Sequence, residues 1–262
     1  FTGKNGIGKT SILEAISILG SGRSFRQGRN SDFIRKGEEA AFLAGAVEHS
    51  GLDTEIKVRI YPQGKKIFLD DKLAKSTESL VKILPFIVFS PADHRIIDGD
   101  SLDRKQFLNR AAINVDFEYL DDFQSYSKAL LQRNRILRDA SLQSWSSNRT
   151  IDTLGSWNEQ LLNYGARLLV RRTLYLSELE PKIEEEYGKI SQSIDKFSLI
   201  YLPFGEEDQK APETETDARE IFRIKLEESL RRDLASGTSQ VGPHKDEILL
   251  TLNGNKVKFY GS

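Results

Sequence analysis

The residues with the clearest chemistry stand at the start of the chain, directly after Phe1 and Thr2. They run Gly3-Lys4-Asn5-Gly6-Ile7-Gly8-Lys9-Thr10 and match the pattern G-x-x-x-x-G-K-[ST] at each fixed position. Glycines let the backbone turn so that successive N–H groups point inward at a phosphate. In this pattern the lysine, here Lys9, reaches the β- and γ-phosphates, and the hydroxyl of Thr10 ligates Mg²⁺. The stretch therefore predicts a site for ATP with Mg²⁺.

The predicted cofactor-binding residues extend one position beyond the pattern, and no catalytic residue is predicted. They are Gly3, Lys4, Asn5, Gly6, Ile7, Gly8, Lys9, Thr10 and Ser11, with Thr10 as the metal ligand.

A helix must follow such a loop, because the positive end of a helix dipole favours bound phosphate. Residues 11–20 meet this requirement: apolar residues recur at helical spacing from Ile12 to Leu19, and Gly20 and Gly22 are expected to end the helix. The alternative is a chance glycine-rich turn, which ordinary residue frequencies produce about once per hundred chains of this length. The helical pattern that follows the loop counts against that alternative.

A complete strand precedes the loop in P-loop proteins, whereas only Phe1 and Thr2 stand before Gly3 here. The chain also contains no methionine. We therefore interpret it as a fragment that is cut inside the first strand.

The rest of the chain has α/β character at both ends and helical character between them. Alternation of Ile56, Val58 and Ile60 with polar residues predicts a half-buried strand, and the apolar run Phe86–Phe89 predicts a strand buried on both faces. Further strands are expected at 41–48, 66–69, 197–202, 248–252 and 256–260, and helices at 103–112, 115–141, 156–190 and 218–234. We predict an α/β P-loop NTPase head of residues 1–97 and 236–262, with an inserted, mainly helical lobe of residues 98–235.

Composition narrows the function classes. A net charge of −1 excludes a generally basic nucleic-acid binder, so any DNA contact must come from local patches. The absence of cysteine excludes disulfides, thiolate metal sites and cysteine nucleophiles, and fits a cytoplasmic location. No run of 18 apolar residues is present, so no membrane-spanning segment is expected.

A basic stretch follows the first predicted helix. Arg23, Arg26 and Arg29 are candidates for contact with DNA phosphates, and Arg35 and Lys36 continue the same run. A solvated loop is the alternative, and Arg23 and Arg26 could also face the nucleotide.

Other charged and aromatic residues have plainer explanations. Two groups of helical arginines are expected on solvated faces beside Asp and Glu, with DNA contact as the alternative. These are Arg133, Arg135 and Arg138, and Arg167, Arg171 and Arg172. The three histidines, which are His49, His94 and His244, are too scattered to argue for a metal site and are expected to be structural. The aromatic residues at helical spacing are expected in the core rather than stacked on bases; they are Phe117, Phe123, Tyr126, Trp157 and Tyr164.

Several short stretches together resemble the RecF family of bacterial DNA-repair proteins. They are Gly22-Arg23-Ser24-Phe25-Arg26, Val88-Phe89-Ser90-Pro91-Ala92-Asp93, Leu131-Gln132-Arg133-Asn134, Trp157-Asn158-Glu159-Gln160-Leu161 and Gly242-Pro243-His244-Lys245-Asp246-Glu247. They span nearly the whole chain, and their combination is more specific than the phosphate loop, which many NTPases share.

The resemblance implies an ABC-type ATPase head, RecF/SMC-like, with a helical lobe. Such proteins form ATP-dependent homodimers in which ATP lies between the two copies. The family holds single- and double-stranded DNA at gaps and junctions, and works with RecR and RecO to load RecA. The implied processes are recombinational repair, replication restart and the SOS response. Through RecR, the family also offers a second partner for the helical arginines.

The chain departs from the family in two places. The family's signature sequence begins G-S-Q-G-Q, whereas this chain stops at Gly261-Ser262, and the Walker B strand with its acidic pair is missing. Because those carboxylates position Mg²⁺ and water, we expect a weak ATPase in the full-length protein but neither hydrolysis nor a closed dimer from this chain. No glutamine stands near Asp93, so a γ-phosphate-sensing role is not transferred, and Asp93 is expected to cap the next segment.

Two alternatives remain from other classes of protein. A short-armed SMC-like structural ATPase would share the head, although the predicted insertion is too short for a coiled-coil arm. A P-loop kinase of a small molecule would need a substrate lid, for which the sequence shows no signature.

Overall fold

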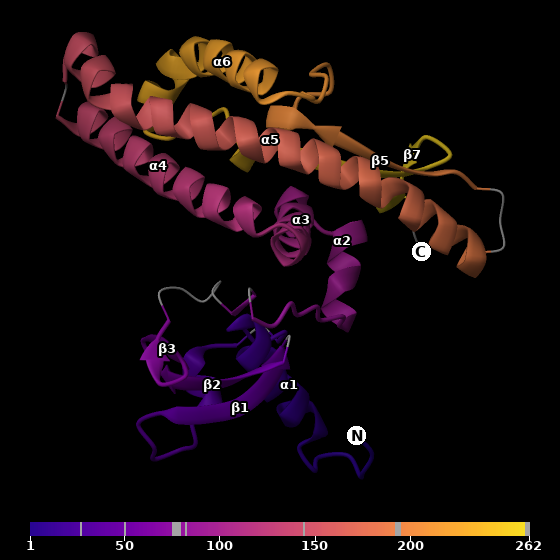
Figure 1. Cartoon of the computed structure of the whole chain (residues 1–262). Helices are drawn as coiled ribbons and strands as arrows, with labels where there is room; N and C mark the ends of the chain where they lie inside the picture. Colours follow the sequence, from indigo (N-terminus) through magenta and orange to yellow (C-terminus); the bar gives the residue numbers. More distant parts are fainter. Residues whose placement is uncertain are drawn as a thin grey trace. The chain divides into compact units, whose positions relative to one another are not determined.

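The computed structural model describes residues 1–26, 28–49, 51–74, 80–81, 83–143, 145–191 and 195–259. The family-like Gly261-Ser262 ending lies outside these residues. The chain divides into two compact units, Phe1–Pro91 and Ala92–Ser262, which are described one at a time (Figure 1).

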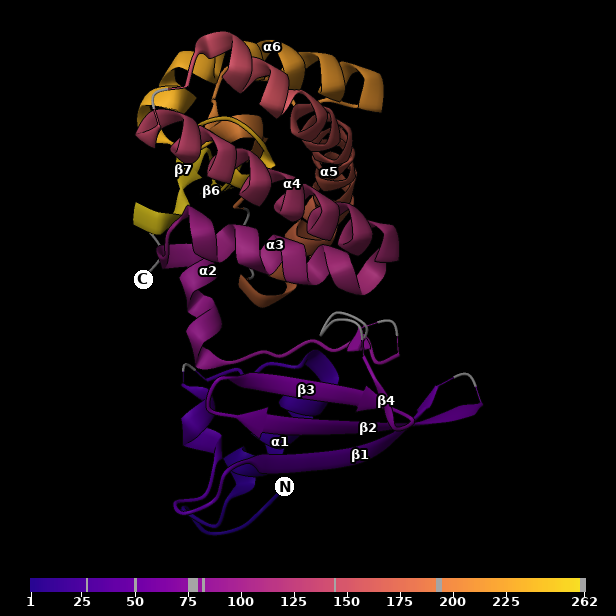
Figure 2. The same ribbon diagram turned by 90° about the vertical axis from the view of Figure 1, so that its left-hand side faces the viewer.

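The first unit places one helix against an antiparallel sheet. Helix α1 spans Lys9–Ser21, and a short 3₁₀ turn, η1, spans Asn30–Phe33. The sheet has the order β1-β2-β3-β4, and its strands are Ala41–His49, Leu52–Tyr61, Gly64–Leu69 and Lys72–Leu73. Figure 2 shows the strands side by side, each antiparallel to the next. The predicted strands at 41–48 and 66–69 and the half-buried strand predicted around Ile56, Val58 and Ile60 are confirmed.

The sheet buries one face because its apolar residues alternate along the strands. Ile56, Val58 and Ile60 of β2 are fully buried, as predicted, and they pack with Ile67 of β3 and Ile18 of α1. This apolar cluster holds α1 in place, and so fixes the helix end that follows the glycine-rich loop.

Of the two glycines predicted to end helix α1, Gly22 does so and Gly20 does not. Its C-cap is Gly22, in the left-handed conformation with φ 67°, whose N–H bonds to Ile18 O, whereas Gly20 lies inside the helix. Gly20 is instead required for packing, because a Cβ there would lie 2.7 Å from the Phe86 ring. The Phe86–Phe89 stretch, predicted as a buried strand, belongs to no strand ladder of the described residues, and Phe89 is 93% exposed. The prediction is wrong because a short apolar run does not by itself distinguish a buried strand from other apolar segments.

The second unit is built from long helices and a small sheet. Its helices are α2 (Arg95–Asp98), α3 (Ser101–Val115), α4 (Phe117–Leu142), α5 (Ser147–Ser191) and α6 (Glu215–Ser236). Its strands are β5 (Phe197–Leu202), β6 (Glu247–Leu252) and β7 (Asn255–Lys256). Its short 3₁₀ turns are η3 (Pro91–His94), η4 (Pro203–Gly205), η5 (Pro243–Lys245) and η6 (Val257–Phe259). The four predicted helices and the strands at 197–202 and 248–252 are confirmed. Of the strand predicted at 256–260, Lys256 lies in β7 and Val257–Phe259 form η6, while residue 260 lies outside the described residues.

Acidic and hydroxyl caps set the helix starts in this unit. Asp100 accepts hydrogen bonds from Leu102 N and Asp103 N at the start of α3, and Asp116 accepts from two N–H groups at the start of α4. Such caps satisfy N–H groups that have no partner inside the helix.

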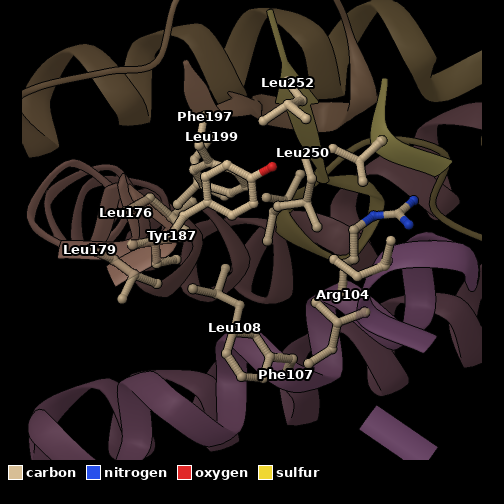
Figure 3. Close-up of a pocket in the computed structure, with 15 residues that line it drawn as sticks. Arg104, Phe107, Leu108, Leu176, Leu179, Tyr187, Phe197, Leu199, Leu250 and Leu252 are labelled. Atoms are coloured by element: carbon tan, nitrogen blue, oxygen red, sulfur yellow. The ribbon is translucent and has the colours of Figure 1, made fainter. Parts of the chain in front are cut away.

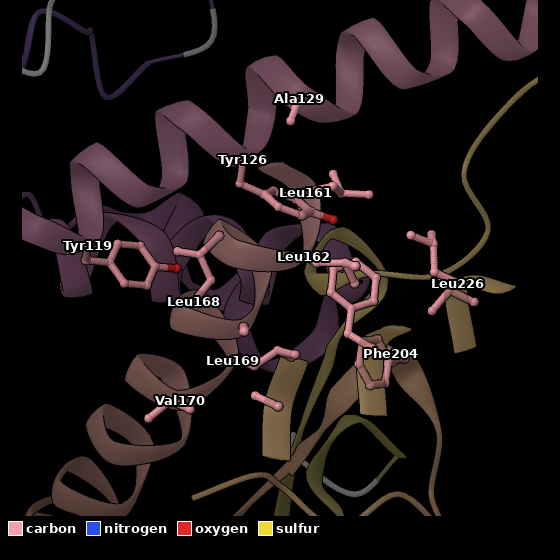
Figure 4. Packing of buried hydrophobic residues seen from close by; sticks show 14 of the residues in the cluster. Tyr119, Tyr126, Ala129, Leu161, Leu162, Leu168, Leu169, Val170, Phe204 and Leu226 are labelled. Atoms are coloured by element: carbon pink, nitrogen blue, oxygen red, sulfur yellow. The ribbon is translucent and has the colours of Figure 1, made fainter. Parts of the chain in front are cut away.

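The core of this unit forms where α4, α5 and α6 pack together. Tyr126 of α4, Leu161 of α5 and Leu226 of α6 are all buried in it (Figure 4), and Phe222 of α6 belongs to the same cluster. Four of the five predicted core aromatics lie in this cluster or against it; they are Phe123, Tyr126, Trp157 and Tyr164. The prediction is wrong for Phe117, which is 44% exposed at the first position of α4.

The C-terminal segment belongs to the second compact unit, because β6 pairs with β5 from Phe197↔Leu252 to Leu202↔Glu247. The predicted head of residues 1–97 and 236–262 therefore differs from the compact units, and it stays a prediction. No helix in the described ranges is long and apolar enough to cross a membrane.

Candidate functional site

Three glycines of the glycine-rich loop have positive φ angles, a backbone conformation that residues other than glycine rarely adopt. Gly3, Gly6 and Gly8 have φ of 152°, 84° and 95°, which strain an L side chain. A Cβ on Gly6 or Gly8 would meet no atom within 4 Å, so glycine is needed there for the backbone conformation and not for room. The sequence pattern therefore encodes the path of this loop.

The loop leads directly into the N-terminus of α1. Gly8 is the N-cap, no side chain caps the helix, and the first turn contains no acidic residue. The first N–H groups of a helix have no partner within the helix and carry partial positive charge. This helix end is thus suited to an anion.

Lys9 places an ammonium group over the loop. Its Nζ donates hydrogen bonds to Gly3 O at 2.6 Å and to Lys4 O at 2.8 Å. An ammonium has three donors, so one donor and the full charge remain for an oxygen anion. Thr10 and Ser11, the next predicted residues, are exposed in the first turn of α1.

The Gly22–Arg26 segment folds back along α1. Ser17 Oγ donates to Arg23 O at 2.9 Å, and Ser24 Oγ donates to the Glu14 carboxylate. Lys65 Nζ of β3 donates to Gly22 O at 3.1 Å, and burial, with the nearby Arg23, lowers the pKa of Lys65. These contacts anchor the backbone of the segment next to the helix that follows the loop.

The three candidate DNA-binding arginines are exposed in the same unit. Arg23, Arg26 and Arg29 form no ion pair with any described residue, although Arg29 N donates to Asp32 Oδ2 at 2.8 Å. Their charges are therefore not neutralised by neighbours in this part of the chain.

Two of the helical arginines that were expected on solvated faces are buried. Arg133 of α4 is 0% exposed, and its Nη1 donates to Asp233 Oδ2 and Ser239 Oγ, each at 2.7 Å. Its neighbour Asn134 accepts from Ser239 N and Oγ, also at 2.7 Å. The prediction is wrong for Arg133 because its carboxylate partner comes from α6, 100 residues away in the sequence.

Arg172 of α5 is the second buried arginine, at 2% exposure. It donates to Asp246 Oδ2 at 2.5 Å and to Pro243 O at 2.6 Å. Although burial opposes the charged form, the neighbouring Tyr119 and Asp246 raise the pKa of Arg172 well above its ordinary value. Arg172 therefore stays charged, and it ties α5 to the turn that precedes β6. Arg135, Arg167 and Arg171 form exposed or partly exposed ion pairs, as Arg135 does with Asp139, and Arg138 is exposed.

His244 connects two of the family-like stretches. Its Nδ1 lies 2.7 Å from Tyr126 OH on α4, and its Nε2 lies 3.1 Å from Ser239 O. Burial lowers the pKa of His244 to about 4, so the ring is neutral at neutral pH. Since Ser239 also bonds to Asn134, the structure joins the Gln132-Arg133-Asn134 stretch to the Gly242–Glu247 stretch in one hydrogen-bonded network, which the sequence alone did not reveal.

Neither Asp93 nor any cluster of potential metal ligands forms a second functional site among the described residues. Asp93 lies in η3 and forms an ion pair with Arg110 at 3.7 Å, and the N-cap of α2 is His94. Among the described residues, no three His, Cys, Asp or Glu side chains gather where they could hold a metal.

A cavity of about 540 Å³ lies within the second unit, between α3, α5 and the β5-β6 sheet (Figure 3). Leucine, isoleucine and aromatic side chains line it, among them Phe107, Leu179 and Leu250. Its single charged lining residue, Arg104, donates through Nε and Nη2 to the Glu247 carboxylate at 3.1 and 3.2 Å. The described lining of the cavity therefore offers no unpaired cationic side chain that could bind a triphosphate. The glycine-rich loop remains the candidate nucleotide site.

Comparison with known proteins gives matches along the whole chain. It is 32% identical over 262 residues to the DNA replication and repair protein RecF of Myxococcus xanthus, covering 99% of this chain and 67% of that protein. It is 31% identical to the protein of the same name from Geotalea daltonii, covering 100% of this chain and 69% of the relative. No family model matches the chain.

Two solved structures that are similar to this chain are also of RecF proteins. A structure described as the recombination mediator protein RecF-ATP in the RecFOR pathway superimposes with a TM-score of 0.86 at 30% identity, covering 98% of this chain and 68% of that one. A second, described as RecF-ATPrS, gives a TM-score of 0.85 at 30% identity, covering 99% and 68%. These matches confirm the predicted fold class, an α/β P-loop ATPase fold with a mainly helical second lobe.

Proposed function

This chain belongs to the RecF family of DNA replication and repair proteins, and we propose that it binds ATP through the loop Gly3–Ser11 as part of an ATP-dependent DNA-repair protein. The observation that carries the proposal is the loop itself: glycines at positive φ lead into a helix end that no side chain caps, beneath the Lys9 ammonium.

The residues present fit a triphosphate with Mg²⁺. Backbone N–H groups of the loop and of the α1 N-terminus would hold phosphate oxygens, and the third donor of Lys9 would contact the β- and γ-phosphates. Mg²⁺ retains water and phosphate ligands, so the single hydroxyl of Thr10 suffices as its protein ligand from this loop. Bound Mg²⁺ would neutralise phosphate charge, while Lys9 orients the phosphate chain.

DNA is the proposed macromolecular ligand, in single- or double-stranded form. Arg23, Arg26 and Arg29 are exposed without ion pairs among the described residues, so each is available to a phosphate group. Solved relatives are described as belonging to the RecFOR pathway, which supports RecR and RecO as partners. Loading of RecA and an ATP-dependent homodimer are proposed for the full-length protein, since neither hydrolysis nor a closed dimer is expected from this chain. A role in repair and replication restart in the cytoplasm follows from the same proposal.

Replacing Lys9 tests the nucleotide site. Lys9→Ala removes the ammonium and its hydrogen bonds, so we expect nucleotide affinity to fall at least tenfold, since a charge-assisted hydrogen bond contributes about 1.5–3 kcal/mol. Titration of a fluorescent ATP analogue with Mg²⁺ measures the dissociation constant.

Lys72→Ala is the matched control, because it removes an exposed lysine of the same unit that lies outside the loop. We expect it to change the affinity less than threefold. Equal affinities of the wild-type chain and Lys9→Ala would contradict the proposed site.

A further inference from the structure

The sheet of the first unit has an outer face, opposite the buried cluster, that carries aromatic and basic side chains together. Phe42 of β1 lies opposite Arg59 of β2, and Arg59 lies opposite Lys66 of β3. Residues opposite each other share a face, as do residues two apart on one strand. Tyr61 and Phe68 therefore belong to the same face, and the five residues together are called the outer strip.

Rings flank the cations of the outer strip. The Arg59 guanidinium lies 5.4 Å from the centre of the Phe68 ring and 5.9 Å from that of Phe42, and Lys66 Nζ lies 5.9 Å from that of Tyr61. Arg59 and Lys66 are exposed, and so is Phe42, at 56%. The rings and charges are thus accessible from the same side of the sheet.

The cations of the outer strip have no carboxylate partner among the described residues, whereas a neighbour on the same face does. Lys57, two residues before Arg59, pairs with Glu55 and Asp71, each at 2.8 Å. Acidic residues of this face lie toward the other end of the sheet: Asp53 and Glu55 on β2, and Glu48 opposite Asp53 on β1. The outer strip therefore has uncompensated positive charge at one end of the sheet.

A plainer explanation is that the cation–ring contacts only stabilise pairing of the strands. They do not account for the more than half exposed Phe42 ring beside Arg59, a cation with no carboxylate partner among the described residues. Rings that stack on bases beside cations that contact phosphates are the combination by which proteins hold single-stranded nucleic acid, often on the face of a sheet. A duplex offers phosphates to the cations but keeps the faces of its bases stacked inside.

We propose that the outer strip binds single-stranded DNA, with Phe42 as a stacking platform and with Arg59 and Lys66 on the phosphates. The inference rests on the proposed DNA-repair function and adds a contact surface separate from Arg23, Arg26 and Arg29. An acidic protein segment would also meet these cations, but it would not need a stacking ring.

Anisotropy titrations of a labelled oligothymidylate at several salt concentrations test the proposal with the whole chain. Phe42→Ala is expected to weaken binding about tenfold, as loss of one base stack does, while Phe42→Trp retains it. The double variant Arg59→Ala/Lys66→Ala is expected to make the plot of log K against log salt concentration less steep. The magnitude of its negative slope should fall by about 1.4, since each neutralised phosphate of a single strand contributes about 0.7. Each substituted side chain is exposed, and thermal melts followed by circular dichroism confirm that the variants fold.

Two controls test whether the losses are specific to the outer strip and to single-stranded DNA. Lys57→Ala removes a cation of the same face that already has carboxylate partners, and it is expected to change affinity less than twofold. Binding of a duplex of equal length is expected to be unchanged by Phe42→Ala, because no base face is available to the ring.

The outcomes separate this inference from the proposed function. Wild-type affinity for oligothymidylate in Phe42→Ala and in the double variant would overturn the outer strip while leaving DNA binding through Arg23, Arg26 and Arg29 intact. Equal losses on duplex and single strand in Phe42→Ala would also overturn it. A chain that binds no oligonucleotide at any salt concentration would contradict the DNA-binding part of the proposed function itself.

Discussion

Single charged residues in this chain differ widely in what they contact, although they look alike in the sequence. Arg133 and Arg135 lie two positions apart on α4, yet Arg133 is fully buried against Asp233 while Arg135 faces solvent. Removing one member of a buried ion pair leaves an uncompensated charge, which costs far more than losing a surface pair. The family-like Arg133-Asn134 and Gly242–Glu247 stretches therefore have a structural role here, as parts of the network that joins α4, α5 and α6 to the turn before β6.

His244 makes this network sensitive to acid. Its pKa is lowered to about 4 in the folded chain, against an ordinary value of 6.5, and burial is the main cause. Between these values the unfolded chain binds more protons than the folded one, so the free energy of unfolding falls as pH falls. The contribution is complete above about pH 6.5 and is lost progressively toward pH 4; it amounts to at most about 3 kcal/mol.

Urea unfolding of the wild-type chain and of His244→Gln between pH 7.5 and pH 4.5 measures this loss. The carboxylates of both proteins titrate alike, so the difference between the two stabilities isolates the histidine. We expect the wild-type advantage to shrink as pH falls from 6.5. A difference that stays constant over the range would show that the ring does not resist protonation in the folded chain.

The elements follow local sequence rules where a partner lies within the same stretch of chain. The helices of the second unit and the alternation of Ile56, Val58 and Ile60 could be predicted, because amphipathic faces are local properties. The sequence predicts the starts of α3 and α4 only approximately, at residues 103 and 115 instead of Ser101 and Phe117. The glycine-rich loop could also be predicted, because its pattern is local. Features that depend on distant residues could not, such as the burial of Arg133 by Asp233 or the missing ladder for Phe86–Phe89.

Two glycines of α5 show how packing can reverse a helix propensity. A Cβ on Gly165 would lie 2.5 Å from the Phe222 ring and 3.2 Å from that of Tyr126, whereas a Cβ on Gly155 would meet nothing within 4 Å. Ala is favoured over Gly in a helix by up to about 1 kcal/mol, so Gly155→Ala is expected to stabilise the chain by about 0.5–1 kcal/mol. Gly165→Ala is expected to destabilise it by about 1–3 kcal/mol through overpacking. Urea denaturation measures both; the same sign for the two variants would contradict the packing described for Gly165.

At the scale of the whole molecule, the two compact units have separate cores. The cluster around Ile18, Ile56 and Val58 contains residues of the first unit alone, and the cluster around Tyr126, Leu161 and Phe222 contains residues of the second alone. The candidate nucleotide site lies entirely in the first unit, on α1 and the loop before it. The buried ionic network lies entirely in the second. Binding and structural stability are therefore assigned to different parts of the chain.

Scanning calorimetry with and without ATP and Mg²⁺ is expected to separate the two units. Chains with more than one core often unfold in more than one step, and a ligand stabilises only the folded unit that binds it. At a free ATP concentration 100 times its dissociation constant, the stabilisation is about 2.7 kcal/mol, which for a unit of this size moves a transition upward by about 11–22 °C. We expect one transition to move and the other to stay, and we expect Gly165→Ala to shift only the transition that ATP leaves in place. If ATP and Gly165→Ala both acted on a single transition, the units would unfold together, and their separate cores would not make them independent.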